Sequence, residues 1–88
     1  MDKFVYIVEC SDGTLYTGYS KDYEKRIAAH NAGRGAKYTR TRRPVRLVFL
    51  QALATQSAAM KREAEIKRMS RAEKVQLCIR WGGYGAAV

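Results

Sequence analysis

Three short apolar runs rich in β-branched and aromatic residues predict three strands along the chain. The first two, "KFVYIVEC" at 3–10 and "LYTGYS" at 15–20, lie close enough to form a hairpin, and Pro44 opens the third, "PVRLVFLQAL". Apolar positions at helical spacing predict one helix before the third strand and two helices after it. The pattern therefore predicts one α+β domain of order ββαβαα, with a small three-stranded antiparallel sheet flanked by helices.

Capping residues mark the borders of the three predicted helices. Ser20 or Asp22 suits the N-cap of the first helix, which spans about ten residues and stops at Gly33. Ser57 begins the second helix, "SAAMKREAEIKRM". Ser70 and a Glu three residues later form a capping box, which starts a third helix that a Gly-Gly pair ends.

The turn between the first two strands decides which side chains share a face. A two-residue loop would pair Tyr6 with Tyr19 and would place Tyr6 and Tyr16 on opposite faces. A three-residue loop, with Gly13 in the left-handed conformation, pairs Tyr6 with Gly18 and places Tyr6 and Tyr16 on one face. We expect the second register, in which Gly18 leaves room for the tyrosine ring.

Composition adds expectations about partners and location. The chain has 88 residues and a formal net charge of +9, which favours an anionic partner, with nucleic acid ahead of an acidic membrane surface. It contains no apolar run of about 18 residues and no leader segment, so we expect a soluble, cytoplasmic protein. Cys10 and Cys78 lack metal-ligand spacing and fit buried free thiols. The length supports one domain, assigned to residues 1–80, with a tail at 81–88.

Basic residues gather in the middle of the chain, where residues 25–62 include ten bases and no acid. A solvated basic face is the simpler interpretation, but "KYTRTRR" also interleaves one aromatic ring and two hydroxyls with its bases, as suits a phosphate backbone. We expect Tyr38 to stack on a base or sugar, and Thr39 and Thr41 to donate to phosphates. The predicted nucleic-acid-binding residues are Arg34, Lys37, Tyr38, Arg40, Arg42 and Arg43.

One acidic residue of the second predicted helix faces the domain. On a helical projection Glu63 shares an arc with Ala59 and Ile66, whereas Glu65 falls on the opposite side. A buried carboxylate without a partner is costly, so Glu63 needs a cation. That cation is either a Lys or Arg in a structural ion pair, or a divalent metal ion held by one carboxylate, water and substrate phosphate.

Arg26 and His30 flank the apolar stripe of the first predicted helix, which Tyr23 and Ile27 form. A lone histidine on a helix is more often satisfied by a local hydrogen bond than catalytic. However, its four-residue offset from Arg26 would let a guanidinium and an imidazole converge on one phosphate.

An ordered set of residues resembles the motifs of the GIY-YIG nuclease superfamily: "VYI" at 5–7, "YTG" at 16–18, and then Arg26, His30 and Glu63. The likeness is closer to the small stand-alone bacterial members and runs from about residue 4 to residue 79. The first motif reads "FVY" rather than Gly-Ile-Tyr, which leaves the tyrosine in place.

The resemblance implies a GIY-YIG-like fold and metal-dependent endonuclease cleavage of DNA phosphodiester bonds. Glu63 would hold one Mg²⁺ or Mn²⁺ ion, and Tyr16, with Tyr6 hydrogen-bonded close by, would generate or orient the attacking water. Arg26 would neutralise the scissile phosphate, and His30 matches a position where some branches carry Tyr. No small-molecule cofactor is expected.

Two other functions stay open from the sequence. The same fold could serve as a nucleic-acid-binding module with little turnover, and nothing in the basic loop separates DNA from RNA. A small assembly protein, docking through Trp81 and Tyr84, is the third possibility. Because the chain shows no appended DNA-recognition domain, we expect its specificity to be low or structure-directed.

Overall fold

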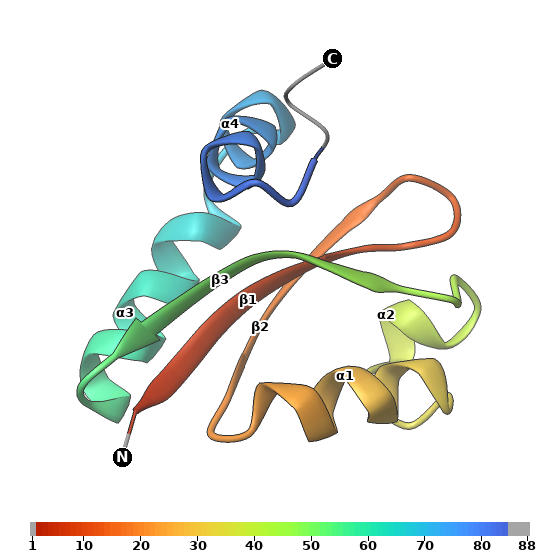
Figure 1. Ribbon diagram of the computed structural model, residues 1–88, viewed down its shortest axis with the longest axis horizontal. Coiled ribbons are helices and arrows are strands. Elements are labelled where there is room, and N and C mark those ends of the chain that lie inside the picture. The colour runs from red at the N-terminus through yellow and green to blue at the C-terminus, as the bar shows by residue number, and fades with distance from the viewer. Residues whose placement is uncertain (1, 85–88) are drawn as a thin grey trace.

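The sheet is built around β1 (Lys3–Glu9), whose residues 5–8 are all buried. The computed structural model describes residues 2–84, where the other elements are β2 (Leu15–Ser20), α1 (Tyr23–Asn31), α2 (Lys37–Arg40), β3 (Arg46–Leu53), α3 (Gln56–Lys67) and α4 (Arg71–Trp81). The strands form one antiparallel sheet in the order β2-β1-β3, as predicted (Figure 1). Helices lie against both faces, so β1 shows no alternation of buried and exposed positions.

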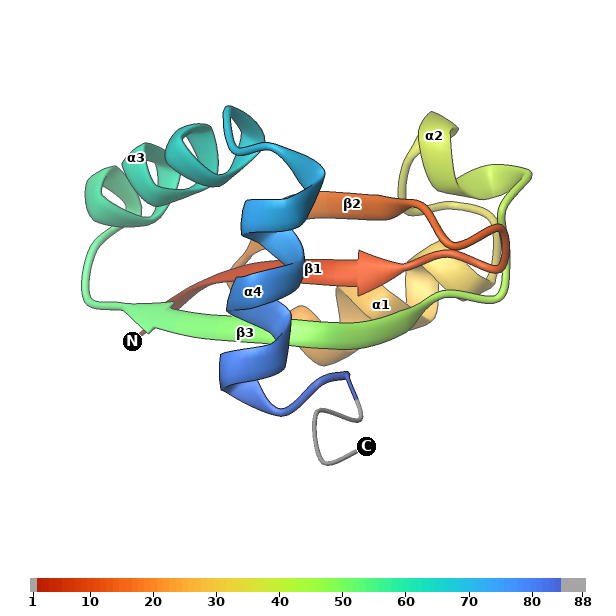
Figure 2. The same ribbon diagram turned by 90° about the horizontal axis from the view of Figure 1, so that it is seen from above.

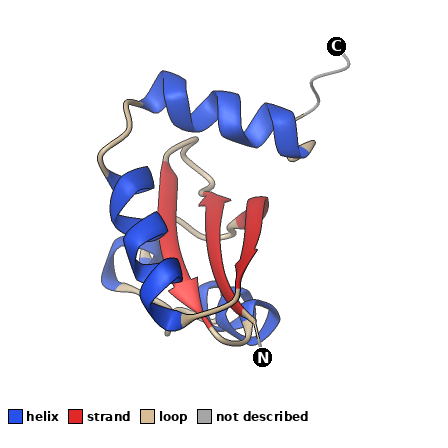
Figure 3. Cartoon of the chain, turned by 90° about the vertical axis from the view of Figure 1, so that its left-hand side faces the viewer, coloured by secondary structure: helices blue, strands red, loops and turns tan. Residues whose placement is uncertain are grey.

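Two hydrophobic clusters, one on each face of the sheet, form the core. Val5 and Ile7 point into the cluster under α3 and α4, which also contains Ile66. Tyr6, between them on the strand, points into the second cluster, where Ile27 of α1 packs. Figure 2 shows α4 crossing over β1 and β3, and Figure 3 shows the sharp bend between α3 and α4. The face toward α1 is therefore the one that carries Tyr6.

The β1–β2 hairpin has the register that the sequence predicts. Gly13 adopts a φ of 84°, in the left-handed region where glycine is favoured. Tyr6 lies opposite Gly18, and both Tyr6 and Tyr16 belong to the cluster that faces α1. The prediction that the two tyrosines share one face is confirmed.

The basic segment between α1 and β3 contains a short helix, α2, that the sequence analysis did not predict. The element order is therefore ββααβαα rather than ββαβαα. A single turn of four residues has no apolar periodicity to reveal it, and its N-cap, Ala36, offers no side-chain hydrogen bond. Tertiary packing holds the turn instead, because its Thr39 is fully buried.

The helix borders follow the predicted caps with one small difference. Asp22 caps α1, and Ser70 caps α4 through a complete capping box. Helix α3 begins at Gln56, one residue before the predicted Ser57, because the hydroxyl of Thr55 accepts a hydrogen bond from a backbone N–H of its first turn.

The folded domain extends beyond the predicted boundary at residue 80. Helix α4 ends at Trp81, and Gly83 lies so close to the backbone of Val48 that a Cβ there would collide with it. The ring of Tyr84 packs against the core cluster under α3 and α4. The part of the expected tail that follows Tyr84 lies outside the described residues.

Cys10 and Cys78 are free and buried, as predicted, in clusters on opposite faces of the sheet. Burial raises the pKa of the Cys78 thiol to about 11. Between residues 2 and 84, no helix has the length and apolar character needed to cross a membrane.

Candidate active site

The phenol of Tyr6 extends from the middle of β1 over Gly18 of β2 toward α1. A Cβ on Gly18 would collide with the Tyr6 ring and hydroxyl, so this position requires glycine for steric reasons. Beyond Gly18 the Tyr6 hydroxyl makes a hydrogen bond of 2.9 Å with Nε2 of His30. The side chain of Tyr6 is 1% exposed, so its position is set by packing on all sides.

His30, in the last turn of α1, is completely buried and contacts side chains of β1, β2 and α2. Its Nδ1 lies 2.7 Å from the hydroxyl of Thr39 on α2. The ring of Tyr16 on β2 meets it edge-on, with 5.3 Å between ring centroids. Gly35 lies against the imidazole so closely that any side chain there would collide with it. The structure thus brings His30 together with both motif tyrosines.

The Tyr6 phenol is also the point where the charges of the predicted site meet. Burial raises the pKa of Tyr6 to about 12, and the nearby Arg26 guanidinium opposes this rise. The neighbouring Tyr16 phenol and the Glu63 carboxylate add to the rise in the pKa. Tyr6 is therefore protonated at neutral pH, and three of the other predicted catalytic residues, Tyr16, Arg26 and Glu63, influence its pKa.

Glu63 on α3 is less exposed than its neighbour Glu65, as the helical projection predicts. The side chain of Glu63 is 18% exposed and that of Glu65 is 52% exposed. Glu63 pairs with Lys67 at 3.2 Å, four residues along the helix, while Glu65 pairs with Arg62 at 2.8 Å. The inward carboxylate therefore has a lysine partner that partly neutralises it.

The donor chemistry around Glu63 suits a metal ion held by a single carboxylate. Within residues 2–84, no group of three or more His, Cys, Asp or Glu side chains is placed to bind a metal ion. Mg²⁺ commonly keeps several water ligands and takes one or two protein carboxylates together with substrate phosphates. The partly exposed carboxylate of Glu63 fits that role, although Lys67 would compete for it.

Three of the predicted nucleic-acid-binding residues hold the basic segment in place. Arg42 donates to the carboxylate of Asp12 at 3.1 Å and to the carbonyl of Tyr38 at 2.7 Å. Its guanidinium lies 4.0 Å from the centre of the Tyr38 ring, and that ring also stacks with Tyr16 at 5.9 Å. Arg43 donates from Nε to a carbonyl of α2 and from Nη1 to the last carbonyl of α1. These contacts tie the basic segment to the hairpin and to α1.

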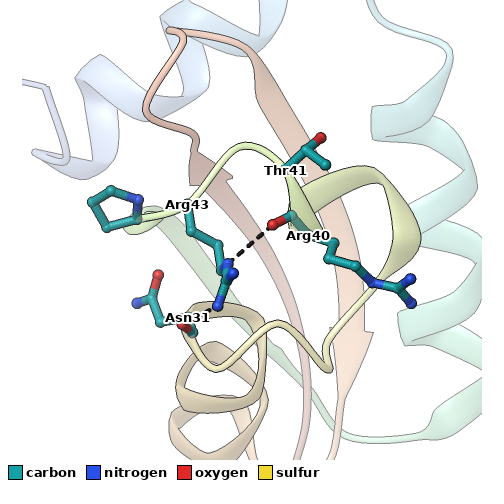
Figure 4. A pocket seen from close by; sticks show the side chains of 5 residues that line it. Asn31, Arg40, Thr41 and Arg43 are labelled. Carbon is teal, nitrogen blue, oxygen red and sulfur yellow. Dashed lines mark hydrogen bonds between the residues drawn. The ribbon is translucent and has the colours of Figure 1, made fainter.

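The other three predicted residues are exposed. Arg34, Lys37 and Arg40 make no side-chain hydrogen bond or ion pair with residues 2–84. Arg40 borders a shallow open pocket lined also by Asn31, Thr41, Arg43 and Pro44 (Figure 4). In Figure 4 the Arg43 side chain reaches toward the Arg40 carbonyl, while the Arg40 side chain points away from it. Arg40 and Arg43 therefore place positive charge around this concave surface.

Sequence reasoning misplaced Thr39 and missed two residues that position the site. Thr39 was expected to donate to phosphates, but it is buried against His30 and cannot reach solvent. Asn31 accepts from the backbone N–H of Val45 at 2.7 Å and donates to its carbonyl at 3.1 Å, which fastens α1 to the start of β3. Gly35, which makes room for the imidazole, gave no signal beyond its place in a glycine-rich turn.

The burial of His30 predicts that the domain loses stability on mild acidification. Burial lowers the pKa of His30 below its ordinary value, and the nearby charge of Arg26 lowers it further. Below about pH 6.5 the unfolded chain takes up a proton that the folded domain resists, so the free energy of unfolding falls as the pH falls. Above that pH His30 is neutral in both the folded and the unfolded state, so it does not make the free energy of unfolding depend on pH.

Urea denaturation between pH 5 and pH 8, expressed as the free energy of unfolding, measures this effect. His30→Gln should unfold more easily at every pH but with a shallower slope between about pH 5 and about pH 6.5. Equal slopes for the two proteins would contradict the assignment of the effect to His30.

Comparisons with known proteins agree with this geometry. The model of the GIY-YIG catalytic domain matches residues 2–76. A UPF0213 protein of Staphylococcus saprophyticus is 60% identical over 78 residues, covering 88% of this chain and 95% of that protein. A UPF0213 protein of Syntrophus aciditrophicus is 60% identical over 75 residues, covering 84% of this chain and 86% of that protein.

Solved structures show the same fold. The solution NMR structure of a UPF0213 protein from Bacillus halodurans has a TM-score of 0.62 and 49% sequence identity, and covers 94% of this chain and 88% of that one. The solution NMR structure of a protein from E. faecalis has a TM-score of 0.61 and 41% identity, over 86% of this chain and 81% of that one. The chain belongs to the GIY-YIG family, and its relatives are the small UPF0213 proteins.

Proposed function

We propose that the protein is a metal-dependent endonuclease that hydrolyses DNA phosphodiester bonds with low or structure-directed specificity. The observation that carries the proposal concerns the Tyr6 phenol. It forms a hydrogen bond with His30, and its pKa is influenced by Tyr16, Arg26 and Glu63. Two phenols, a guanidinium and a carboxylate close enough to influence the pKa of one of those phenols supply the groups that phosphodiester hydrolysis needs.

Each residue has a distinct task in the proposed reaction. Arg26, exposed at the rim of the site, would bind the scissile phosphate and stabilise the negative charge that develops on it. The phenols of Tyr16 and Tyr6 would orient the attacking water, and His30 holds the Tyr6 phenol in place. Glu63 would hold one Mg²⁺ or Mn²⁺ ion. When bound, that ion would supply Lewis acidity and lower the pKa of water.

The substrate would be held mainly through its phosphates. The net charge of +9 and the exposed side chains of Arg34, Lys37 and Arg40 support an electrostatic contact with a nucleic-acid backbone. Contacts of this kind carry no base-sequence information, which accords with low specificity. The ring of Tyr38 already stacks with Tyr16 and Arg42, so Tyr38 is better suited to supporting Tyr16 than to stacking on a base. The two buried free thiols support a cytoplasmic location.

A second function, nucleic-acid binding without turnover, is favoured by one observation. The ion pair of Glu63 with Lys67 neutralises the inward carboxylate without a metal ion. If that pair is the whole role of Glu63, the domain would bind nucleic acid through its basic face and leave it intact.

A substrate panel tested with and without metal separates the two functions. Single-stranded, duplex, flapped and branched DNA, together with an RNA duplex, would be incubated with Mg²⁺, with Mn²⁺ and with EDTA. We expect cleavage of at least one DNA substrate that requires the divalent ion. Binding whose affinity falls steeply with salt, with every substrate left intact in both metals, would favour the binding module.

A further inference from the structure

A buried chain of hydrogen bonds links Tyr6 through His30 to Thr39. Which group donates and which accepts in each bond follows from where the protons of the three side chains are. The imidazole has two ring nitrogens, and in its neutral form one of them carries a proton while the other accepts a hydrogen bond. His30 is neutral at physiological pH because burial and the charge of Arg26 lower its pKa. The two neutral tautomers therefore give opposite directions to the chain.

The Tyr6 end of the chain requires a bare Nε2. Tyr6 is protonated and buried, so its O–H must find an acceptor. The guanidinium of Arg26, whose charge acts on the same phenol, can only donate. Within residues 2–84, the acceptor found for the Tyr6 proton is Nε2 of His30, at 2.9 Å. Nε2 therefore carries no proton, and the proton of the imidazole is on Nδ1.

The Thr39 end of the chain agrees with this assignment. The Thr39 hydroxyl has one proton, which it donates to the backbone carbonyl of Ala36 at 3.2 Å. Its oxygen is then free to accept the Nδ1–H of His30 at 2.7 Å. Every proton in the chain has one acceptor in this arrangement. If Nε2 carried the proton instead, the buried Tyr6 O–H would have no acceptor among the described residues.

We infer that Thr39 is a positioning residue, which holds His30 in the Nδ1–H tautomer. In this tautomer the Tyr6 O–H donates a hydrogen bond to His30, and the lone pairs of the Tyr6 oxygen face the site. The consequence for catalysis rests on the proposed nuclease function. While the Tyr6 O–H donates its hydrogen bond to His30, the phenol oxygen can only accept a hydrogen bond from the attacking water. With the other tautomer, Tyr6 would turn its O–H toward the site and could not align the water through its oxygen in the same way.

The chain offers an unambiguous spectroscopic test, because His30 is its single histidine. Long-range ¹H–¹⁵N correlation spectra of the ¹⁵N-labelled protein at pH 7.5 distinguish a protonated ring nitrogen from a bare one. We expect Nδ1 to be protonated and Nε2 to be bare in the wild-type protein. The opposite pattern would overturn the inference without any reference to activity.

Two variants test the role of Thr39, and a third is the control. Thr39→Ser keeps a hydroxyl and should keep the wild-type pattern. Thr39→Val has nearly the same shape but no acceptor, so a fraction of the imidazole should move to the Nε2–H tautomer. Thr41→Val, at an exposed threonine two residues further on, should leave the spectrum unchanged. If Thr39→Val folds and its spectrum equals that of the wild type, Thr39 does not set the tautomer.

Kinetics on a cleaved substrate complete the test. We expect Thr39→Val to lower kcat roughly tenfold with little change in KM, and Thr39→Ser to restore kcat to within about twofold of the wild type. An unchanged kcat in Thr39→Val, together with an altered tautomer, would overturn the catalytic consequence. A wild-type protein with the expected tautomer and no cleavage of any substrate would overturn the proposed function while supporting the tautomer.

Discussion

Glu63→Gln is expected to reduce metal-dependent cleavage by at least about a hundredfold while leaving DNA affinity nearly unchanged. The amide has the same shape as the carboxylate but no charge, so it would hold a divalent ion far more weakly and cannot form the ion pair with Lys67. We expect DNA to be held mainly by basic residues elsewhere on the surface, so its binding should not depend on this carboxylate. Cleavage in Mg²⁺ and in Mn²⁺, and fluorescence anisotropy of labelled DNA in EDTA, measure the two quantities separately.

Glu65→Gln is the matched control, because it makes the same chemical change two residues away. Glu65 is mostly exposed and its partner is Arg62, so we expect its cleavage rate to stay within about twofold of the wild type. If Glu63→Gln cleaved as fast as Glu65→Gln, the pair of Glu63 with Lys67 would be purely structural. The nuclease site would then have to lie elsewhere.

Gly18→Ala is expected to damage stability and cleavage together. A Cβ at this position would collide with the ring and hydroxyl of Tyr6, which is almost completely buried. Overpacking of this kind costs about 1–3 kcal/mol of unfolding free energy. Since the displaced phenol is the one that bonds His30, we also expect kcat to fall at least roughly tenfold. Urea denaturation and steady-state cleavage give the two values.

Gly13→Ala separates the effect on the site from a general loss of stability. Gly13 has a φ of 84° and no atom near the position that a Cβ would take. Alanine there should cost about 1 kcal/mol through backbone strain alone and should leave kcat unchanged. The same loss of kcat in both variants would show that cleavage follows overall stability rather than the position of Tyr6.

The sequence predicted the half of the site that depends on local rules. The pairing of Tyr6 with Gly18 follows from strand alternation and the conformation of an Asp-Gly turn, both of which act within a few residues. The inward position of Glu63 follows from helical geometry. Its lysine partner could have been named as well, because a Glu followed four residues later by Lys is a common ion pair on a helix.

The other half depends on contacts between distant segments and had no local signal. Helix α2 is too short to show periodicity, so the burial of Thr39 against His30 could not be read from "KYTRTRR". For the same reason, bases that looked available for phosphates proved to be partly used within the chain. Arg42 pairs with Asp12 thirty residues away, and Arg43 bonds two backbone carbonyls.

The central place of β1 also determines how the site responds to thermal motion. Tyr6 lies on a strand that is bonded on both edges and covered on both faces, so separating it from its neighbours requires opening of the whole sheet. The exposed side chains of Arg34, Lys37 and Arg40 can change rotamer without any such opening. We therefore expect these basic side chains to adjust to nucleic acids of different shape while the Tyr6 phenol stays in place.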